Sequence, residues 1–178
     1  MTDDEVLVRS TLAGDRRAFA CLYDRYAQLV RAICYDMTSD IDRSEDLCQD
    51  VFLQAYRNLR QLRDSARFAS WLTGIARLTC RNWRRRHGCL DKAADVDLQA
   101  IPQANPTQEV GDDELAVLHG WLRQLPEKER LAIQVRYLLE APPDKAGAIL
   151  RLSRAGFYRV LDRAMKRLRR LAKMHEAR

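Results

Sequence analysis

Apolar residues recur every three or four positions along most of this chain, which is the spacing of amphipathic α-helices. In the first part of the chain Asp15 is placed to cap a helix. The expected apolar stripe of that helix is Phe19, Leu22, Tyr23, Tyr26, Leu29, Val30 and Ile33. After a polar break at 36–42, Asp42 or Ser44 is placed to cap a second helix. The expected buried stripe of this second helix is Leu47, Cys48, Val51, Phe52, Ala55 and Leu59.

A third helix is predicted to begin near Ala66 and to end in an arginine-rich run at 81–86. Its core residues are expected to be Phe68, Trp71, Leu72 and Ile75. Acidic residues gather around the break between the first two helices: Asp36, Asp40, Asp42, Glu45, Asp46 and Asp50. Their spacing matches no calcium-binding loop, so we interpret them as helix caps and a polar surface.

The last third of the chain has the same helical spacing. Asp112 or Asp113 opens a helix, and Pro126 restarts the chain at the first position of the next. The apolar stripes of these two helices are Leu115, Leu118, Leu122 and Leu125, then Leu131, Ala132, Val135, Leu138 and Leu139. A short helix from Asp144 to Leu150, a tight turn at 151–153 and a long basic helix follow. This is the layout of a helix-turn-helix, whose second helix enters the major groove of DNA.

No alternating strand pattern is present, so the expected fold class is all-α with two small helical domains. Residues 93–112 contain two prolines and no basic residue, and they lack a helical repeat. We interpret them as the main part of a flexible linker that could reach about 65 Å when extended. The expected division is a first domain at 1–90, a linker at 91–112 and a second domain at 113–178.

The charge is unevenly distributed along the chain. The net charge of +6 combines about +3 in 1–92, −4 in 93–112 and +7 in 113–178, and 26 of the 31 cationic residues are arginine. Arginine clusters on helices suit a polyphosphate partner, although a solvated charged face gives the same pattern. No apolar stretch is long enough to span a membrane, and the acidic N-terminus does not resemble a secretory signal. We therefore expect a cytoplasmic protein without membrane insertion.

Two outward-facing surfaces remained ambiguous from the pattern alone. The outer side of the second helix mixes charges with the exposed Leu53 and Tyr56, as a protein interface does, but an ordinary solvent face is also compatible. Trp83 lies among arginines and could stack on an unpaired base, or it could cap the end of the core.

The last helix separates its residues clearly. Its apolar stripe is Phe157, Val160, Leu161, Ala164, Leu168 and Leu171. Its early outward residues are placed to approach base edges and its later cations to approach phosphates. A generic basic amphipathic helix that binds an acidic partner or a membrane surface is the alternative.

The sequence offers no candidate active site. It contains no Gly-rich phosphate loop and no HExxH motif, and its three histidines show no pairing with a nucleophile. The five cysteines lack CxxC spacing and are expected to be reduced thiols, with a metal site at His87 and Cys89 as the weaker alternative. We expect no enzyme activity, no cofactor, no metal and no small-molecule substrate.

Several short motifs, in order along the chain, resemble the extracytoplasmic-function (ECF) class of bacterial RNA polymerase sigma factors, group 4 of the sigma-70 family. They are Ala18-Phe19 with Leu22-Tyr23 and Arg25-Tyr26, the run from Glu45 to Phe52, Phe68 with Trp71-Leu72 and Ile75-Ala76-Arg77, Leu125-Pro126 with Arg130, and Arg163-Ala164. The resemblance implies that the first domain is sigma region 2 and the second is sigma region 4. It also implies a role in promoter recognition and in promoter melting at transcription initiation.

The resemblance assigns a partner to each surface. Binding to the beta-prime clamp helices of the polymerase core is implied for Asp46, Gln49, Asp50, Leu53, Tyr56 and Arg57. Binding to the minus-10 element is implied for Arg77, Leu78, Arg81, Asn82, Trp83, Arg84, Arg85 and Arg86. Binding to the minus-35 element is implied for Ser153, Arg154, Ala155, Tyr158, Arg159, Arg163, Lys166 and Arg167. The beta flap of the polymerase and an anti-sigma factor are further expected partners.

The chain departs from the family pattern at a few positions. Leu78 and Asn82 stand where the family often has Asn and Asp, and Lys145-Ala146-Gly147 and Arg151 replace the usual Glu-Ile-Ala and turn Gly. A glycine inside a helix costs about 1 kcal/mol relative to alanine, so the second domain is expected either to be less stable or to belong to a divergent subgroup. The alternative functions are a helix-turn-helix regulator that binds DNA without polymerase, and a basic protein that binds RNA or acts as an adaptor.

Overall fold

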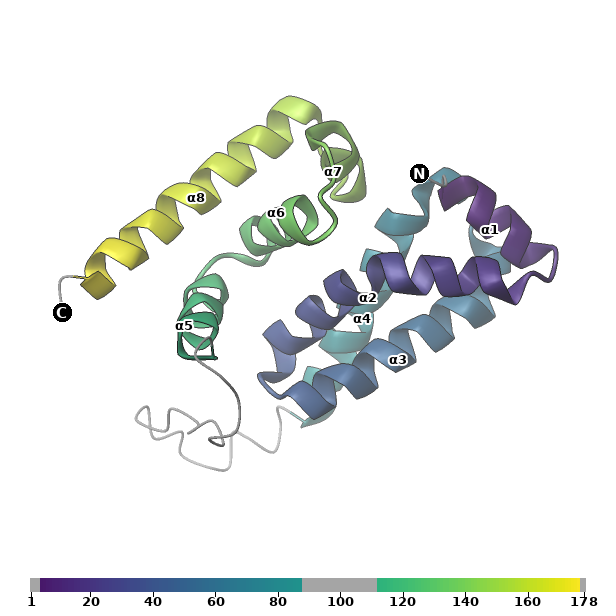
Figure 1. Cartoon of the computed structure of the whole chain (residues 1–178), viewed down its shortest axis with the longest axis horizontal. Helices are drawn as coiled ribbons and strands as arrows, with labels where there is room; N and C mark the ends of the chain where they lie inside the picture. The colour runs from purple at the N-terminus through teal and green to yellow at the C-terminus, as the bar shows by residue number, and fades with distance from the viewer. Residues whose placement is uncertain (1–3, 88–111, 177–178) are drawn as a thin grey trace.

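The computed structural model describes residues 4–87 and 112–176, and all regular structure in these two ranges is helical (Figure 1). The elements are α1 (Asp4–Leu12), α2 (Arg16–Thr38), α3 (Ile41–Asn58), the 3-10 turns η1 (Leu59–Gln61) and η2 (Ser65–Arg67), α4 (Phe68–His87), α5 (Asp112–Arg123), α6 (Glu127–Leu138), α7 (Pro143–Ile149) and α8 (Arg154–Glu176). The all-α fold class is confirmed. The predicted linker lies outside the described residues apart from its last residue, so the proposed domain boundaries stay a prediction.

Helix α1 was not predicted from the sequence. It buries only Leu7, Val8 and Thr11, which is too few apolar positions to give a clear helical repeat. Asp4 fixes the start of α1 to α2, because its carboxylate accepts hydrogen bonds from Arg25 and Tyr26. Burial and this carboxylate together raise the pKa of the Tyr26 hydroxyl well above its usual value.

The caps of α2 and α3 agree with the prediction in one case and correct it in the other. Asp15 caps α2 by accepting a hydrogen bond of 2.8 Å from the backbone N–H of Arg17. Asp40, and not Asp42 or Ser44, caps α3 by accepting 3.0 Å from the N–H of Arg43. Ser44 is buried inside the first turn of α3, where its hydroxyl donates to the carbonyl of Ile41. The polar break is therefore only two residues long, because α2 continues through Asp36 to Thr38.

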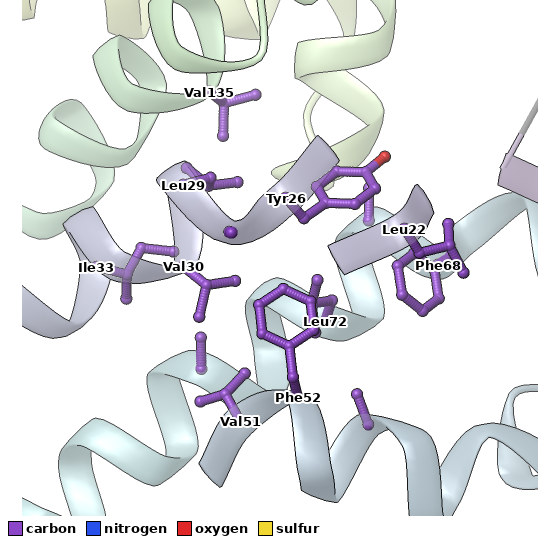
Figure 2. Close-up of a cluster of buried hydrophobic side chains, with 14 of the residues drawn as sticks. Leu22, Tyr26, Leu29, Val30, Ile33, Val51, Phe52, Phe68, Leu72 and Val135 are labelled. Atoms are coloured by element: carbon purple, nitrogen blue, oxygen red, sulfur yellow. The ribbon is translucent and has the colours of Figure 1, made fainter. Parts of the chain in front are cut away.

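The predicted stripes of α2, α3 and α4 meet in one buried cluster (Figure 2). Leu22 and Val30 of α2, Val51 of α3 and Phe68 and Leu72 of α4 are all at most 1% exposed. Full burial of such a side chain contributes about 1.5–3 kcal/mol each, so this cluster is the main source of stability for α1–α4. The third helix was placed correctly, although its first turn from Ser65 is a 3-10 turn.

The C-terminal helices bury fewer apolar residues than their stripes predict. Leu118 on α5 is 40% exposed, and Leu138 and Leu139 at the end of α6 are only half-buried. Instead, α6 buries the polar Glu129 and Gln134, which an apolar pattern cannot detect. Pro126 was predicted to be the first helical residue of α6. In the structure it is the N-cap, and α6 begins at Glu127.

Helices α7 and α8 form the predicted helix-turn-helix. Helix α7 ends in a Schellman motif, in which the N–H groups of Arg151 and Leu152 donate to the carbonyls of Ala148 and Gly147. Arg151 has φ of 55°, in the left-handed region that favours glycine. Phe157 and Val160 of α8 then pack behind the turn and are at most 4% exposed.

Gly147 lies at a position of α7 where the fold leaves no room for a larger residue. A Cβ atom at this position would lie 2.9 Å from the carbonyl oxygen of Leu152 and 3.5 Å from Cβ of Phe157. Only glycine lets α7 approach the turn and α8 this closely. Gly147 is therefore a packing requirement of this helix-turn-helix, while the lower stability expected for the second domain stays a prediction.

The two sets of helices also touch each other. Helix α6 packs on α2, and α7 packs on α4. Val135 of α6 belongs to the same buried cluster as Leu29 and Ile33 of α2 (Figure 2). We refer to α1–α4 as the N-terminal unit and to α5–α8 as the C-terminal unit.

Candidate protein and nucleic-acid interfaces

The outer face of α3 presents all six residues that were predicted to bind polymerase. These are Asp46, Gln49, Asp50, Leu53, Tyr56 and Arg57, and each is exposed. Leu53 is 51% exposed and Tyr56 is 46% exposed, while their neighbours Val51 and Phe52 lie in the core. An exposed leucine and tyrosine among charges is the composition of a protein interface.

An aromatic cluster fixes the position of Tyr56. Its ring meets the ring of Phe19 edge to face, with centroids 4.9 Å apart, and Phe19 in turn contacts Phe52 at 6.4 Å. Tyr23 contacts the other side of Phe52 at 4.6 Å. Because aromatic edge-to-face pairs add about 0.5–1.5 kcal/mol beyond burial, Tyr56 is held in place before any partner binds.

The second half of α4 carries the residues that were predicted to bind the minus-10 element. Leu78, Arg81, Arg84, Arg85 and Arg86 are exposed, and Leu78 is 53% exposed. Thr79 and Cys80, which the prediction omitted, are buried against the core. The arrangement is one exposed, strongly cationic end of a helix.

Three residues that were predicted to belong to this surface are less exposed to solvent than the others. Asn82 and Trp83 are half-buried, and Arg77 is half-buried with its Nε donating 2.6 Å to Glu127 of α6. This contact lowers the pKa of the Glu127 carboxyl below its usual value, mainly through the hydrogen bond from Arg77. The Arg77 side chain is thus occupied by the C-terminal unit.

Trp83 combines features of both sequence-based alternatives. Its ring packs partly against the core, as a capping residue does. Its remaining surface meets His87, stacked at 4.8 Å and 20°, and the guanidinium of Arg43 at 6.0 Å from the ring centroid. Stacking and cation contacts are the interactions that an unpaired base would use, so a base at this ring would have to replace His87.

The outward side of α8, with Ser153 immediately before it, presents the eight residues that were predicted to bind the minus-35 element. Ser153, Arg154, Ala155, Tyr158, Arg159, Arg163, Lys166 and Arg167 are each exposed. Within the described residues four of the five cations have an acidic partner: Arg154 lies 3.6 Å from Asp144, Lys166 lies 2.8 Å from Asp162, and Arg163 and Arg167 lie 3.9 and 3.3 Å from Glu129. No ion pair to Arg159 is found in the described part of the chain, which leaves its guanidinium available for a ligand.

Glu129 is a residue of this region that the sequence did not reveal. It lies on α6 and is 6% exposed, yet it faces two cations of α8. A buried carboxylate needs such partners, so Arg163 and Arg167 support the packing of α6 on α8.

A second polar cluster joins the two units and was also missed. Asp36 of α2 accepts from Gln134 at 2.8 Å and pairs with Arg130 at 2.6 Å, and both of these partners lie on α6. Burial raises the pKa of the Asp36 carboxyl, and the guanidinium of Arg130 opposes that shift. Asp36 lies inside α2 with its side chain 6% exposed, so its interpretation as part of a polar break between two helices was wrong.

Comparison with known proteins places this chain in a family. The family model for sigma-70 region 2 matches residues 22–89. The chain is 31% identical over 153 residues to the ECF RNA polymerase sigma factor SigM of Bacillus subtilis, a match that covers 84% of this chain and 92% of that protein. The chain belongs to the ECF RNA polymerase sigma factors.

Other relatives of this sigma factor agree. It is 31% identical over 160 residues to the ECF sigma-E factor of Escherichia coli K12, with 83% of this chain and 82% of that protein covered. It is also 31% identical to the probable sigma factor RfaY of Xanthomonas campestris, but the match covers 88% of this chain and only 41% of RfaY. The family resemblance inferred from short motifs is thereby confirmed.

Solved structures share the fold of this sigma factor. The structure of CnrH in complex with the cytosolic domain of CnrY matches with a TM-score of 0.70 at 22% identity, covering 97% of this chain and 99% of that one. The structure of the sigma factor RpoE in complex with the anti-sigma factor NepR from Bartonella quintana matches with a TM-score of 0.63 at 22% identity, covering 87% and 96%. These matches extend over both helical units.

The cysteines of this sigma factor in the described residues are all free thiols. Cys34, Cys48 and Cys80 are buried thiols and Cys21 is an exposed one, while Cys89 lies outside the described residues. No group of potential metal ligands, and no helix suited to crossing a membrane, occurs among the residues that the structure describes. A cleft of about 700 Å³ lies between the units and is lined by Arg25 and Arg67 on one side and Pro142 and Lys145 on the other.

Proposed function

We propose that this sigma factor directs RNA polymerase core to specific promoters and helps to hold the melted DNA during transcription initiation. The observation that carries the proposal is the helix-turn-helix of α7 and α8, whose eight predicted DNA-contacting residues, Ser153 before α8 and seven on α8, are all exposed. A recognition helix with this exposure fits the major groove of DNA. The exposed Leu53 on α3 and the arginines at the end of α4 supply the two further contacts that a sigma factor needs.

In this proposal the outer face of α3 binds the beta-prime clamp helices of polymerase. Leu53 provides an apolar contact at the centre, and Tyr56 is held beside it by Phe19. The charged residues Asp46, Asp50 and Arg57 surround this contact and make it specific. Binding of the beta flap belongs to the C-terminal unit.

The end of α4 binds the minus-10 element. Its exposed arginines neutralise phosphates of the single strand, and Trp83 offers a ring surface to an unstacked base once His87 moves aside. Leu78 contributes an exposed apolar contact where many family members have Asn.

The first two turns of α8 read the minus-35 element. Arg159 is the cation there that is free of an ion pair within the described residues, and an arginine of this kind binds guanine through two hydrogen bonds. Arg154 and Lys166 lie in exposed ion pairs, which are weak and easily exchanged for phosphate contacts.

This function makes the protein a transcription initiation factor that catalyses no reaction itself and acts in the cytoplasm, where polymerase is. We also propose a protein inhibitor as a regulatory partner. Among the similar solved structures, the sigma factor RpoE is in complex with the anti-sigma factor NepR, and CnrH is in complex with the cytosolic domain of CnrY. The proposal includes no small-molecule substrate, no cofactor and no membrane insertion.

Replacement of Leu53 by Asp tests the polymerase contact. A carboxylate at the centre of an apolar contact loses hydration without a partner, so L53D should reduce co-purification with core polymerase at least tenfold. Since Leu53 is exposed, the thermal unfolding temperature should remain within about 2 °C of wild type.

The matched control is Val6→Asp on α1. Val6 is 53% exposed, close to the 51% of Leu53, and it lies outside the three proposed surfaces. V6D should co-purify with polymerase as wild type does. Equal retention of L53D and V6D would remove α3 from the polymerase interface.

A further inference from the structure

Two buried cysteine thiols lie against each other in the core of the N-terminal unit. The Sγ atoms of Cys34 on α2 and Cys80 on α4 are 3.6 Å apart, and both residues are 0% exposed. Because α2 packs directly on α4, the fold holds the two sulfur atoms at this separation. A disulfide bond needs about 2.05 Å, so the sulfur atoms have to approach by only about 1.5 Å. The proposed function uses neither thiol.

A third buried thiol has a different partner. Cys48 on α3 is 2% exposed, and its Sγ lies 3.9 Å from the backbone carbonyl oxygen of Ala27, to which it donates. Burial raises the pKa of this thiol, which keeps it protonated. Cys48 therefore provides a matched comparison for the pair, because it is the same residue type in the same core with nearly the same burial.

Cys80 also lines a small cavity of about 20 Å³. Four charged residues from α2, α4 and α6 contribute to the cavity wall: Asp36, Arg77, Glu127 and Arg130. A polar cavity of this size has room for one water molecule, or for hydrogen peroxide, which is only slightly larger. Neither Cys34 nor Cys48 lines this cavity. Among the thiols that the structure describes, Cys80 is thus the one that a molecule in the cavity meets.

The surroundings of Cys80 favour reaction at its sulfur atom. A hydrogen bond with Cys34 stabilises the Cys80 thiolate and lowers the pKa of Cys80, against the opposing effects of burial and the Asp36 carboxylate. The thiolate is the form of cysteine that acts as a nucleophile. The guanidinium groups of Arg77 and Arg130 supply positive charge at the cavity, where hydroxide would leave a peroxide.

We propose that hydrogen peroxide enters the cavity beside Cys80 and converts Cys80 and Cys34 into a reversible disulfide. Cys80 is the thiol that reacts first, and Cys34 is the thiol that completes the bond. This proposal concerns the free chain and does not rest on the proposed function.

The reaction has two balanced steps. The Cys80 thiolate attacks one oxygen of the peroxide, the O–O bond breaks, and the hydroxide that leaves takes up a proton and becomes water. Cys80 is then a sulfenic acid. The Cys34 sulfur attacks the sulfur of this acid, so that the S–S bond forms, the S–O bond breaks and hydroxide leaves with the Cys34 proton as a second water. Two thiols are oxidised and one peroxide is reduced, and a small dithiol reverses the bond by exchange.

The disulfide should stabilise the folded protein. It joins two residues that are 46 positions apart, and a cross-link across a loop of this length restricts the unfolded chain strongly. Oxidation should therefore raise the thermal unfolding temperature by at least about 5 °C, and dithiothreitol should remove the increase. A bond that forms without raising this temperature would overturn the expected stabilisation.

Peptide mapping identifies which thiols are joined. Trypsin cuts between the three buried cysteines and gives the peptides 32–43, 44–57 and 78–81, each with one of them. The full chain, with Cys21 and Cys89 replaced by Ser, is treated with hydrogen peroxide, unfolded in the presence of a thiol-blocking reagent and digested. The expected product is peptide 32–43 joined to peptide 78–81, and it should disappear after treatment with dithiothreitol.

Three alanine variants test the pair and the order of reaction. Cys34→Ala and Cys80→Ala should each abolish the joined peptides and the gain in unfolding temperature, while the matched control Cys48→Ala should keep both. Cys34→Ala should leave Cys80 as a sulfenic acid, which dimedone traps on peptide 78–81. Cys80→Ala should show no dimedone on peptide 32–43. Circular dichroism should show the helix content of wild type in all three variants.

A bulkier oxidant tests the route through the cavity. tert-Butyl hydroperoxide is too large for a cavity of about 20 Å³. After correction for the rates of the two peroxides with free cysteine, it should form the bond at least tenfold more slowly than hydrogen peroxide. Equal corrected rates would overturn this route.

The mapping results decide the proposed site. A bond from peptide 44–57 to either of the other peptides, or no bond at all in the folded chain, would overturn the pairing of Cys34 with Cys80. Dimedone on Cys34 in Cys80→Ala, as much as on Cys80 in Cys34→Ala, would overturn the assignment of Cys80 as the thiol that reacts first.

Discussion

Two residues in and before the turn between α7 and α8 depart from the family pattern: Gly147 lies inside α7, and Arg151 occupies the turn position with positive φ. The family pattern puts glycine in the turn, and here Arg151 adopts that left-handed conformation while Gly147 lies inside the helix. The backbone explains Gly147, because its missing Cβ makes room for the carbonyl of Leu152. Arg151 has no such justification, since a side chain at φ of 55° costs energy.

Replacing Arg151 by Gly should therefore stabilise the protein by about 1 kcal/mol, because glycine adopts positive φ without a steric penalty. Thermal unfolding should show an increase of about 2–4 °C for a chain of this size. Lys145→Gly, an exposed cation in the helical part of α7, is the control and should lower stability by about 1 kcal/mol. A decrease for both variants would contradict the strain assigned to Arg151.

Replacing Gly147 by Ala should destabilise the protein despite the higher helix propensity of alanine. Overpacking against the Leu152 carbonyl costs about 1–3 kcal/mol, which outweighs the propensity gain of about 1 kcal/mol. Gly74→Ala is the matched control, because its Cβ would meet nothing within 4 Å, and it should stabilise the protein by up to about 1 kcal/mol. Denaturant unfolding distinguishes the two, and a gain at both positions would show that the turn can relax.

Single polar residues were the hardest to place from sequence. Asp36 was interpreted as part of a polar break and no role was predicted for Glu129, yet the side chain of each is buried against cations from another helix. Their partners are far away in the sequence, with Gln134 98 positions from Asp36. Periodicity describes one helix at a time and carries no information about such pairs.

At the scale of helices the sequence was a good guide wherever an apolar stripe was long. The stripes of α2 and α3 were predicted nearly residue by residue, and all six outward residues of α3 are exposed as expected. In α4 the predicted core residues Phe68 and Leu72 are buried, while Trp71 and Ile75 are only partly buried.

Helix α1 was missed because it is short. The apolar stripes predicted for α5 and α6 were overestimated, because Leu118 of α5 is exposed and α6 buries the polar Glu129 and Gln134. Helix ends were uncertain because several Asp and Ser residues competed for each cap, and only the fold selected Asp40.

The recognition helix supports one prediction about DNA readout. Arg159→Ala should weaken binding to the cognate minus-35 sequence by about 1–3 kcal/mol, because a guanidinium that bonds a guanine edge is lost. Binding to a scrambled sequence should change much less. Fluorescence anisotropy with the two duplexes, in polymerase holoenzyme, measures both affinities.

The control for this prediction is Arg60→Ala, which removes an exposed arginine on η1 outside the proposed surfaces. It should lower neither affinity appreciably. Equal losses on cognate and scrambled DNA for Arg159→Ala would mean that Arg159 contacts only phosphate, and minus-35 reading would then rest on other residues of α8.

At the scale of the whole molecule the net charge of +6 is a poor description. The cations that matter lie at the end of α4 and along α8, and several of the others are neutralised by acids within the fold. The sequence predicted two helical units and their two cationic surfaces. It gave no indication that the units pack together, because that contact joins residues far apart in the sequence: Asp36 pairs with Arg130, and Val135 packs in the apolar cluster of α2.

Promoter-directed transcription is the central claim for the molecule, and a reconstituted reaction tests it most directly. Purified core polymerase, this protein and genomic DNA should yield transcripts whose start sites share one minus-10 and one minus-35 sequence. Core polymerase alone, or with L53D, should yield no such set. Start sites that are identical with and without the protein, or binding to a palindromic site in the absence of polymerase, would contradict the account.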